Sequence, residues 1–251
     1  MEKIGNKNKT LFFLNMIMLL LFIISCILLH TSPDRLTAAA FCHQIPSRSS
    51  EYDFPFCYRC SGLFGGICFG WAAAVFCRKS NKLFSPLEIL TFFVSASLFL
   101  IDILNSSKFS GFSIYPETVK FRLLSAYPLG FMIIQIIWRV FSRWLNDSVS
   151  QKRIAGSFKV LLMPAGGILT YIFIFSHNYV LSVIFRNMLA ISAFALLTIL
   201  YTLLILCIIE LKNHKSRVLS ALSVGFIFAM LHIILFGGIH IRFIHFDQFF
   251  S

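Results

Sequence analysis

The chain has 251 residues, of which 58% are apolar and only 13% are charged, and its net charge is +12. A water-soluble globule of this size leaves too much surface exposed to hide so apolar a composition. We therefore exclude a soluble enzyme, a disordered chain and a small secreted domain held by disulfides, and we expect an all-α, polytopic membrane helix bundle.

Seven apolar segments have the length of membrane-spanning helices. A helix needs about 20 apolar residues to cross the hydrocarbon core of a bilayer. In chain order the segments are 11–29, 61–77, 86–104, 122–138, 158–176, 187–209 and 218–239. We therefore predict about seven transmembrane helices, with the lipid bilayer as the main partner of the chain.

The basic residues indicate the orientation of these helices. They gather at the N-terminus and in alternate connecting segments, with clusters at 3–9, 78–82, 139–153 and 212–217. Cytoplasmic loops of membrane proteins carry such an excess of lysine and arginine. We predict a multi-pass protein of the cytoplasmic membrane, with its N-terminus in and its C-terminus out. The positive charge serves orientation, so we expect no nucleic-acid partner.

The first apolar segment has a second interpretation. Its basic start and the sequence Ile23-Ile24-Ser25-Cys26 resemble a lipoprotein signal with its acceptor cysteine. The apolar run continues directly past Cys26, however. We therefore interpret the segment as an uncleaved helix.

The outside loop at residues 30–60 contains the residues with the most distinctive chemistry. Cys42, His43, Cys57 and Cys60 follow the spacing C-H-x13-C-x2-C. A Cys-x2-Cys pair can place two thiolates on one ion, and Cys42 or His43 can complete a tetrahedral set. Such soft ligands suit zinc and also copper(I). We predict a metal site at these four residues, with a structural or metal-handling role.

Two other hypotheses use the same cysteines. Outside the cytoplasm cysteines meet an oxidising environment, so a structural disulfide that pins the loop is our second interpretation. The third is a membrane thiol–disulfide oxidoreductase that uses Cys57 and Cys60, with Cys42 as the resolving thiol. A metal-dependent lipid hydrolase is a weaker option, so the sequence leaves enzymatic activity open.

Glycines follow the cysteine pair at a helical spacing. Gly62, Gly66 and Gly70 fall on one face of the second apolar segment. Glycines at this spacing let a neighbouring backbone approach closely, which drives helix association in lipid. We predict that this face packs on another helix and holds the cysteine-bearing helix end rigid.

The segments CHQIPSRS and PFCYRCSGLFGGICFG, within residues 41–70, resemble domain-of-unknown-function family 2085 of bacterial and archaeal membrane proteins. The resemblance covers about residues 36–133. It implies a membrane location and a shared Cys/His site, and it carries no established activity. We accordingly divide the chain into a family-like membrane domain of four helices at 1–138 and an additional three-helix region at 139–251.

The resemblance also groups four charged residues with the cysteines: Arg48, Arg59, Asp102 and Arg122. Asp102 lies near the outer end of the third segment and Arg122 at the outer start of the fourth. An ionisable residue inside a span is costly unless it is paired or functional. We expect Asp102 to pair with Arg122 or to support His43, and all four residues to surround the metal ligands.

Overall fold

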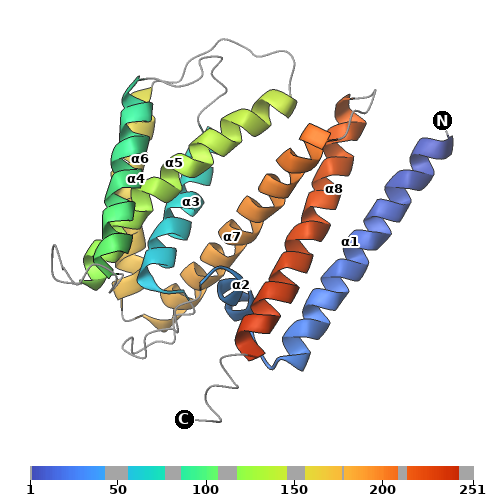
Figure 1. The fold of residues 1–251 in the computed structure, drawn as a ribbon, viewed down its shortest axis with the longest axis horizontal. Helices are drawn as coiled ribbons and strands as arrows, with labels where there is room; N and C mark the ends of the chain where they lie inside the picture. Colours follow the sequence, from blue (N-terminus) through green and yellow to red (C-terminus); the bar gives the residue numbers. More distant parts are fainter. Residues whose placement is uncertain are drawn as a thin grey trace. The chain divides into compact units, whose positions relative to one another are not determined.

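The fold is helical throughout the part of the chain that the structure describes. The computed structural model describes residues 2–42, 56–76, 86–106, 118–145, 156–176, 178–208 and 214–242. Its helices are α1 (Glu2–Leu28), α2 (Pro33–Phe41), α3 (Tyr58–Phe76), α4 (Pro86–Ser106), α5 (Val119–Leu145), α6 (Gly156–Phe175), α7 (Tyr179–Ile208) and α8 (His214–His232) (Figure 1). A π-helical turn, η1 (Ile233–Gly237), follows α8.

Five stretches of these helices are long and apolar enough to cross a membrane. They are Leu11–Leu28, Pro86–Asn105, Val119–Ser142, Tyr179–Ile208 and Val218–Arg242. The other two predicted segments form α3 and α6, and the apolar part of α6, Leu162–Phe175, is shorter. The predicted class, an all-helical multi-pass membrane protein, is thus confirmed, whereas seven crossings and their orientation stay predictions.

Apolar side chains cover the outward faces of α1 and α4. Phe13 is 70% exposed, Leu28 72% and Phe93 63%. Rows of large apolar side chains at such exposure are unfavourable in water, whereas lipid tails solvate them. The lipid bilayer is therefore the solvent that these helices fit.

The chain divides into two compact units, which are described separately. The first unit comprises Met1–Ile45 and Ala193–Ser251, and the second comprises Pro46–Ser192. This division follows contacts in space. The predicted division into 1–138 and 139–251 concerned family-like and additional sequence, and it stays a prediction.

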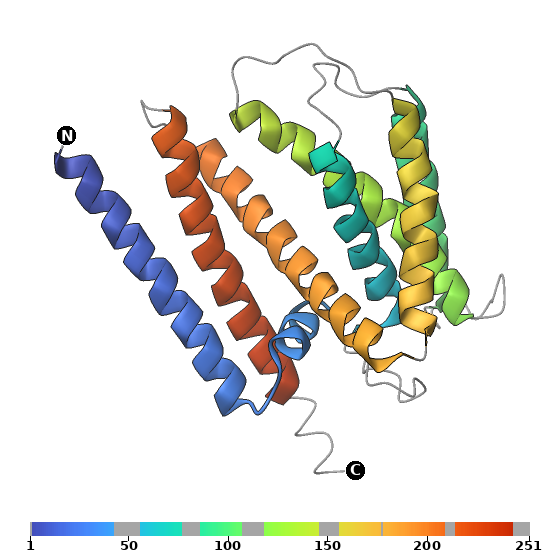
Figure 2. The ribbon, with the colours of Figure 1, turned by 180° about the vertical axis from the view of Figure 1, so that it is seen from behind.

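In the first unit α1 packs on α8, and the short α2 packs on η1 (Figure 2). A core of buried residues joins these elements, including Cys26, Leu36, Ala229 and Ile233. A Cβ on Gly237 would overlap the carbonyl of Leu36, so a glycine is required where η1 meets α2. The helix α2, which leads to Cys42, is thereby held against η1 within this unit.

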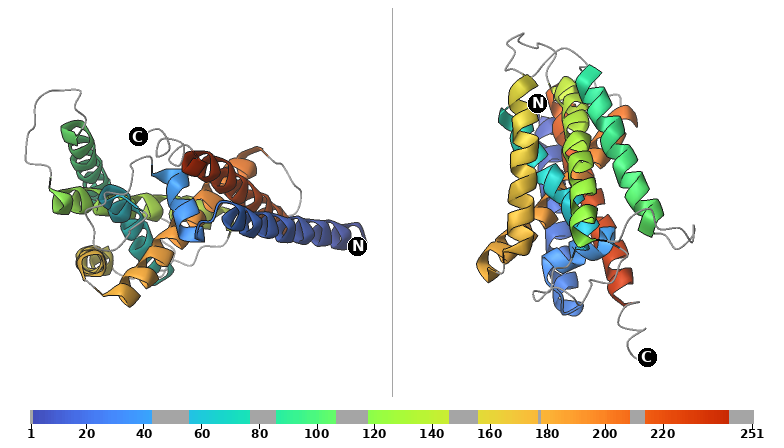
Figure 3. Two further views of the ribbon diagram at one scale, coloured as in Figure 1. Left: turned by 90° about the horizontal axis from the view of Figure 1, so that it is seen from below. Right: turned by 90° about the vertical axis from the view of Figure 1, so that its left-hand side faces the viewer.

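In the second unit α3 packs most extensively on α5 and also contacts α6, while α4 packs on α5 (Figure 3). The α3 glycines face α5 at its backbone. A Cβ on Gly62 would overlap the carbonyl of Leu123, and one on Gly66 would overlap the carbonyl of Tyr127. The two helix axes are therefore closer here than side chains would allow.

Polar contacts add to this packing. The buried Gln135 of α5 donates a hydrogen bond from Nε2 to the carbonyl of Gly70 at 2.8 Å. At the beginning of α4, Glu88 forms an ion pair with Arg139 of α5, whose Nη1 lies 3.0 Å from the carboxylate. Both contacts satisfy polar groups that lipid would leave without partners.

Candidate functional site

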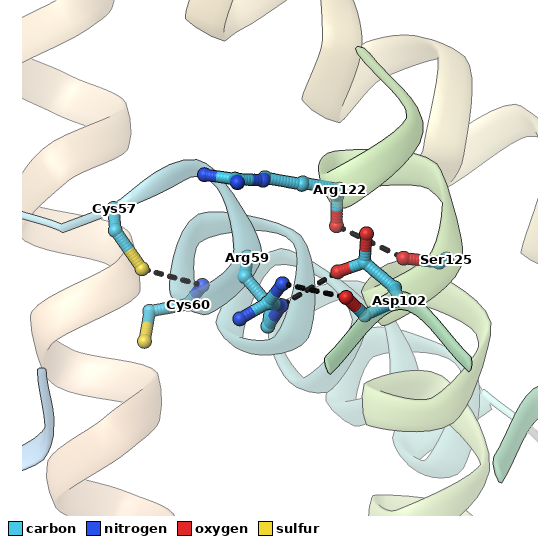
Figure 4. Close-up of polar contacts among 6 residues, drawn as sticks. All are labelled: Cys57, Arg59, Cys60, Asp102, Arg122 and Ser125. Atoms are coloured by element: carbon cyan, nitrogen blue, oxygen red, sulfur yellow. Dashed lines mark hydrogen bonds and ion pairs between the residues drawn. The ribbon is translucent and has the colours of Figure 1, made fainter. Parts of the chain in front are cut away.

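Cys57 caps the N-terminus of α3. Its carbonyl accepts the backbone N–H of Ser61 at 2.8 Å, and its Sγ accepts the backbone N–H of Cys60 at 3.5 Å (Figure 4). This is the position at which a side-chain acceptor normally satisfies one of the unpaired N–H groups of a helix start. An N–H donor and the positive end of the helix dipole both favour thiolate over thiol.

The residue before this cap is held by packing. Phe56 is 2% exposed, and its ring lies 5.5 Å from the ring of Phe64. The hydroxyl of the fully buried Ser61 donates to the carbonyl of Phe56 at 3.4 Å. The turn from Phe56 to Cys60 is therefore ordered, with Cys57 and Cys60 half-buried on it.

Arg59, between the two cysteines, binds Asp102 of α4. Its Nε donates to the Asp102 carboxylate at 2.6 Å, and its Nη2 donates to the Asp102 carbonyl at 3.2 Å. The Asp102 side chain is only 2% exposed and that of Arg59 13%. A carboxylate this deeply buried requires a charged partner, and Arg59 supplies it.

Asp102 has Arg59 as a charged partner, whereas we expected Arg122. The guanidinium of Arg122 points away from Asp102, and the Arg122 carbonyl accepts a hydrogen bond from the hydroxyl of Ser125 at 3.2 Å (Figure 4). The lengths of the apolar segments predicted the membrane level of Asp102 and Arg122. The rotation of each helix about its own axis decides which arginine reaches Asp102, and here it is Arg59.

The structure brings Cys57, Arg59, Cys60 and Asp102 together at one end of α3 and α4. Cys42 follows α2 in the first unit, where it is 4% exposed and its N–H donates to the carbonyl of Ala38 at 2.8 Å. Of the predicted metal ligands, Cys57 and Cys60 lie together in the second unit, whereas Cys42 belongs to the first. His43 and Arg48 lie outside the described residues.

One polar pair has no signal in the sequence. His232 of α8 lies with its Nδ1 3.0 Å from the hydroxyl of Tyr201 in α7, within the first unit. The rings of Phe41 and Phe236 flank it, with centroids 6.2 and 4.5 Å from that of the imidazole. The partners of His232 thus come from α2, α7 and η1.

A multi-pass helical membrane protein with a cysteine pair at a helix start is the class that this fold and site define. Residues 42–136 match the family model of the predicted membrane proteins DUF2085. This confirms the resemblance found in the sequence, and the match begins at Cys42 and includes α3, α4 and most of α5. No curated protein and no solved structure matches the chain.

Proposed function

We propose that this protein of the cytoplasmic membrane binds zinc on its extracytoplasmic side through Cys42, His43, Cys57 and Cys60. The metal has a structural role or is handled as cargo. The observation that carries the proposal is the turn at the start of α3, where Cys57 Sγ accepts the N–H of Cys60. This turn favours the thiolate form, which is the form that binds metal.

The available donors fit zinc. Structural zinc sites take four ligands, and sulfur and imidazole nitrogen are their usual donors. Cys57 and Cys60 supply two sulfurs from one helical turn. In the proposal Cys42 supplies a third sulfur, and His43 is adjacent to Cys42 in the sequence. Copper(I) accepts the same thiolates and is the alternative metal.

A thiol–disulfide oxidoreductase is the second candidate, because both cysteines of the pair are half-buried at a helix start that favours thiolate. In that chemistry the two thiols become one disulfide and release two electrons and two protons to an acceptor, such as a membrane quinone. The resolving thiol would be Cys42.

A single labelling experiment separates these candidates. Intact cells are treated with a membrane-impermeant maleimide, and the labelled cysteines are identified by mass spectrometry. If zinc is bound, Cys57 and Cys60 react from outside only after a chelator has been added, because metal-bound thiolates are protected. Cys207, at the predicted cytoplasmic end of α7, stays unlabelled in intact cells and therefore reports on leakage of the reagent.

Equal labelling with and without chelator would contradict the zinc proposal. A pair that becomes reactive after a reductant, and not after a chelator, is a disulfide and favours the second candidate. Labelling of Cys57 and Cys60 only in broken cells would contradict the orientation.

A further inference from the structure

We infer that Asp102 positions the metal-binding turn by holding Arg59, so that the metal affinity of the cysteines depends on a carboxylate of α4. This inference rests on the proposed function and extends it. Arg59 is the second residue of α3 and lies between Cys57 and Cys60 in the sequence. Its side chain nevertheless turns onto Asp102 (Figure 4).

The contact holds Arg59 at two points. Nε binds the carboxylate at 2.6 Å, and Nη2 binds the carbonyl of the same residue at 3.2 Å. Two hydrogen bonds from one planar guanidinium fix its orientation as well as its position, and charge strengthens the bond to the carboxylate. The first turn of α3 is thereby tied to the last turns of α4.

Burial makes this contact obligatory. A charged pair with side chains 2% and 13% exposed loses much more when one partner is removed than a surface pair does, because the other charge stays without compensation. Arg59 therefore has little freedom to turn elsewhere, and the backbone of the cysteine turn is held with it.

The pair also controls the charge beside the sulfurs. While Arg59 is bound to Asp102, its positive charge is neutralised. Without the carboxylate, an uncompensated guanidinium remains next to two thiolates and competes with a metal cation for them. The added positive charge favours thiolate but repels a metal cation, so the loss of position sets the sign, and Asp102→Asn is expected to lower metal affinity.

The test is zinc affinity of the purified full chain in detergent, measured by competition with a chromophoric chelator. We expect Asp102→Asn to weaken zinc binding about 10- to 100-fold, as is usual when a group that supports metal ligands is lost. The matched control is Glu88→Gln, which breaks the ion pair with Arg139 at the other end of the same helix. We expect both variants to lower the unfolding temperature, because each breaks an ion pair of α4, but we expect Glu88→Gln to leave zinc affinity unchanged.

A double-mutant cycle shows whether Asp102 acts through Arg59. In an Arg59→Gln background, Asp102→Asn has no further effect on zinc affinity, because the group that it holds is absent. An equal effect in both backgrounds, or unchanged affinity in Asp102→Asn, overturns the inference. Should Asp102→Asn fail to fold, Arg59→Lys keeps the charge and loses the two-point contact, and the same loss of affinity is expected.

The same assay tests the proposed function separately: if the proposed function is wrong, the unmodified chain binds no zinc. The inference is then decided by the alkylation rates of Cys57 and Cys60 in the metal-free protein. Asp102→Asn changes these rates several-fold because it releases a cation beside the thiols, and Glu88→Gln does not. Unchanged rates overturn the inference in that case.

Discussion

Replacing both Cys57 and Cys60 by serine removes the bound metal, from about one zinc ion per chain to less than about a tenth of that. A serine hydroxyl is a hard and weakly acidic donor, so the double variant loses the two soft ligands of the turn. Elemental analysis of the detergent-purified variant measures the change. The helix itself persists, because serine is a good residue at a helix start.

The control is Cys68→Ser. Cys68 lies deeper in the same helix, α3, and is not one of the proposed ligands. This variant retains its zinc. Full retention in the double variant, or equal loss in Cys68→Ser, would contradict the assignment of the ligands. Cys42→Ser, which removes one sulfur, has a smaller effect and weakens binding without abolishing it.

Gly66→Ala is expected to destabilise the second unit by about 1–3 kcal/mol, the usual cost of overpacking. The added Cβ would overlap the carbonyl of Tyr127 and lie 2.7 Å from the backbone nitrogen of Phe131. Backbone atoms cannot rotate away, so α3 and α5 must separate. Thermal unfolding in detergent measures the loss.

Gly167→Ala is the matched control, since its added Cβ meets only the ring of Tyr127, at the ordinary contact distance of 3.4 Å. Alanine is the better helix former by about 1 kcal/mol, so this variant is neutral or slightly stabilised. Equal destabilisation of the two variants would show that the close approach at Gly66 is not what holds the helices together.

The lengths of the apolar runs predicted the helices well, because span length depends on bilayer thickness. The ends of the runs were less informative. The segment predicted at 187–209 begins at Tyr179 in the structure, because Arg186 interrupts the apolar run without ending the helix. The short α2 was missed, because its nine residues, including Asp34 and Arg35, have neither the length nor the composition of a span.

Part of the local geometry of the candidate site was predictable from the spacing of its residues. The spacing of Cys57 and Cys60 placed both sulfurs at one helix start, and the structure adds that Cys57 caps it. The partner of Asp102 was not predictable, because it depends on how each helix is rotated in the bundle. The same holds for Tyr201 and His232, which come together across two helices.

Zinc content of the unmodified protein is the most direct test of the central claim. The full chain is purified in detergent without added metal or chelator, and its metals are measured by elemental analysis beside a count of reactive thiols. We predict about one zinc ion per chain, with Cys57 and Cys60 unreactive until a chelator removes it. Metal-free protein whose Cys57 and Cys60 are joined in a disulfide would contradict the claim.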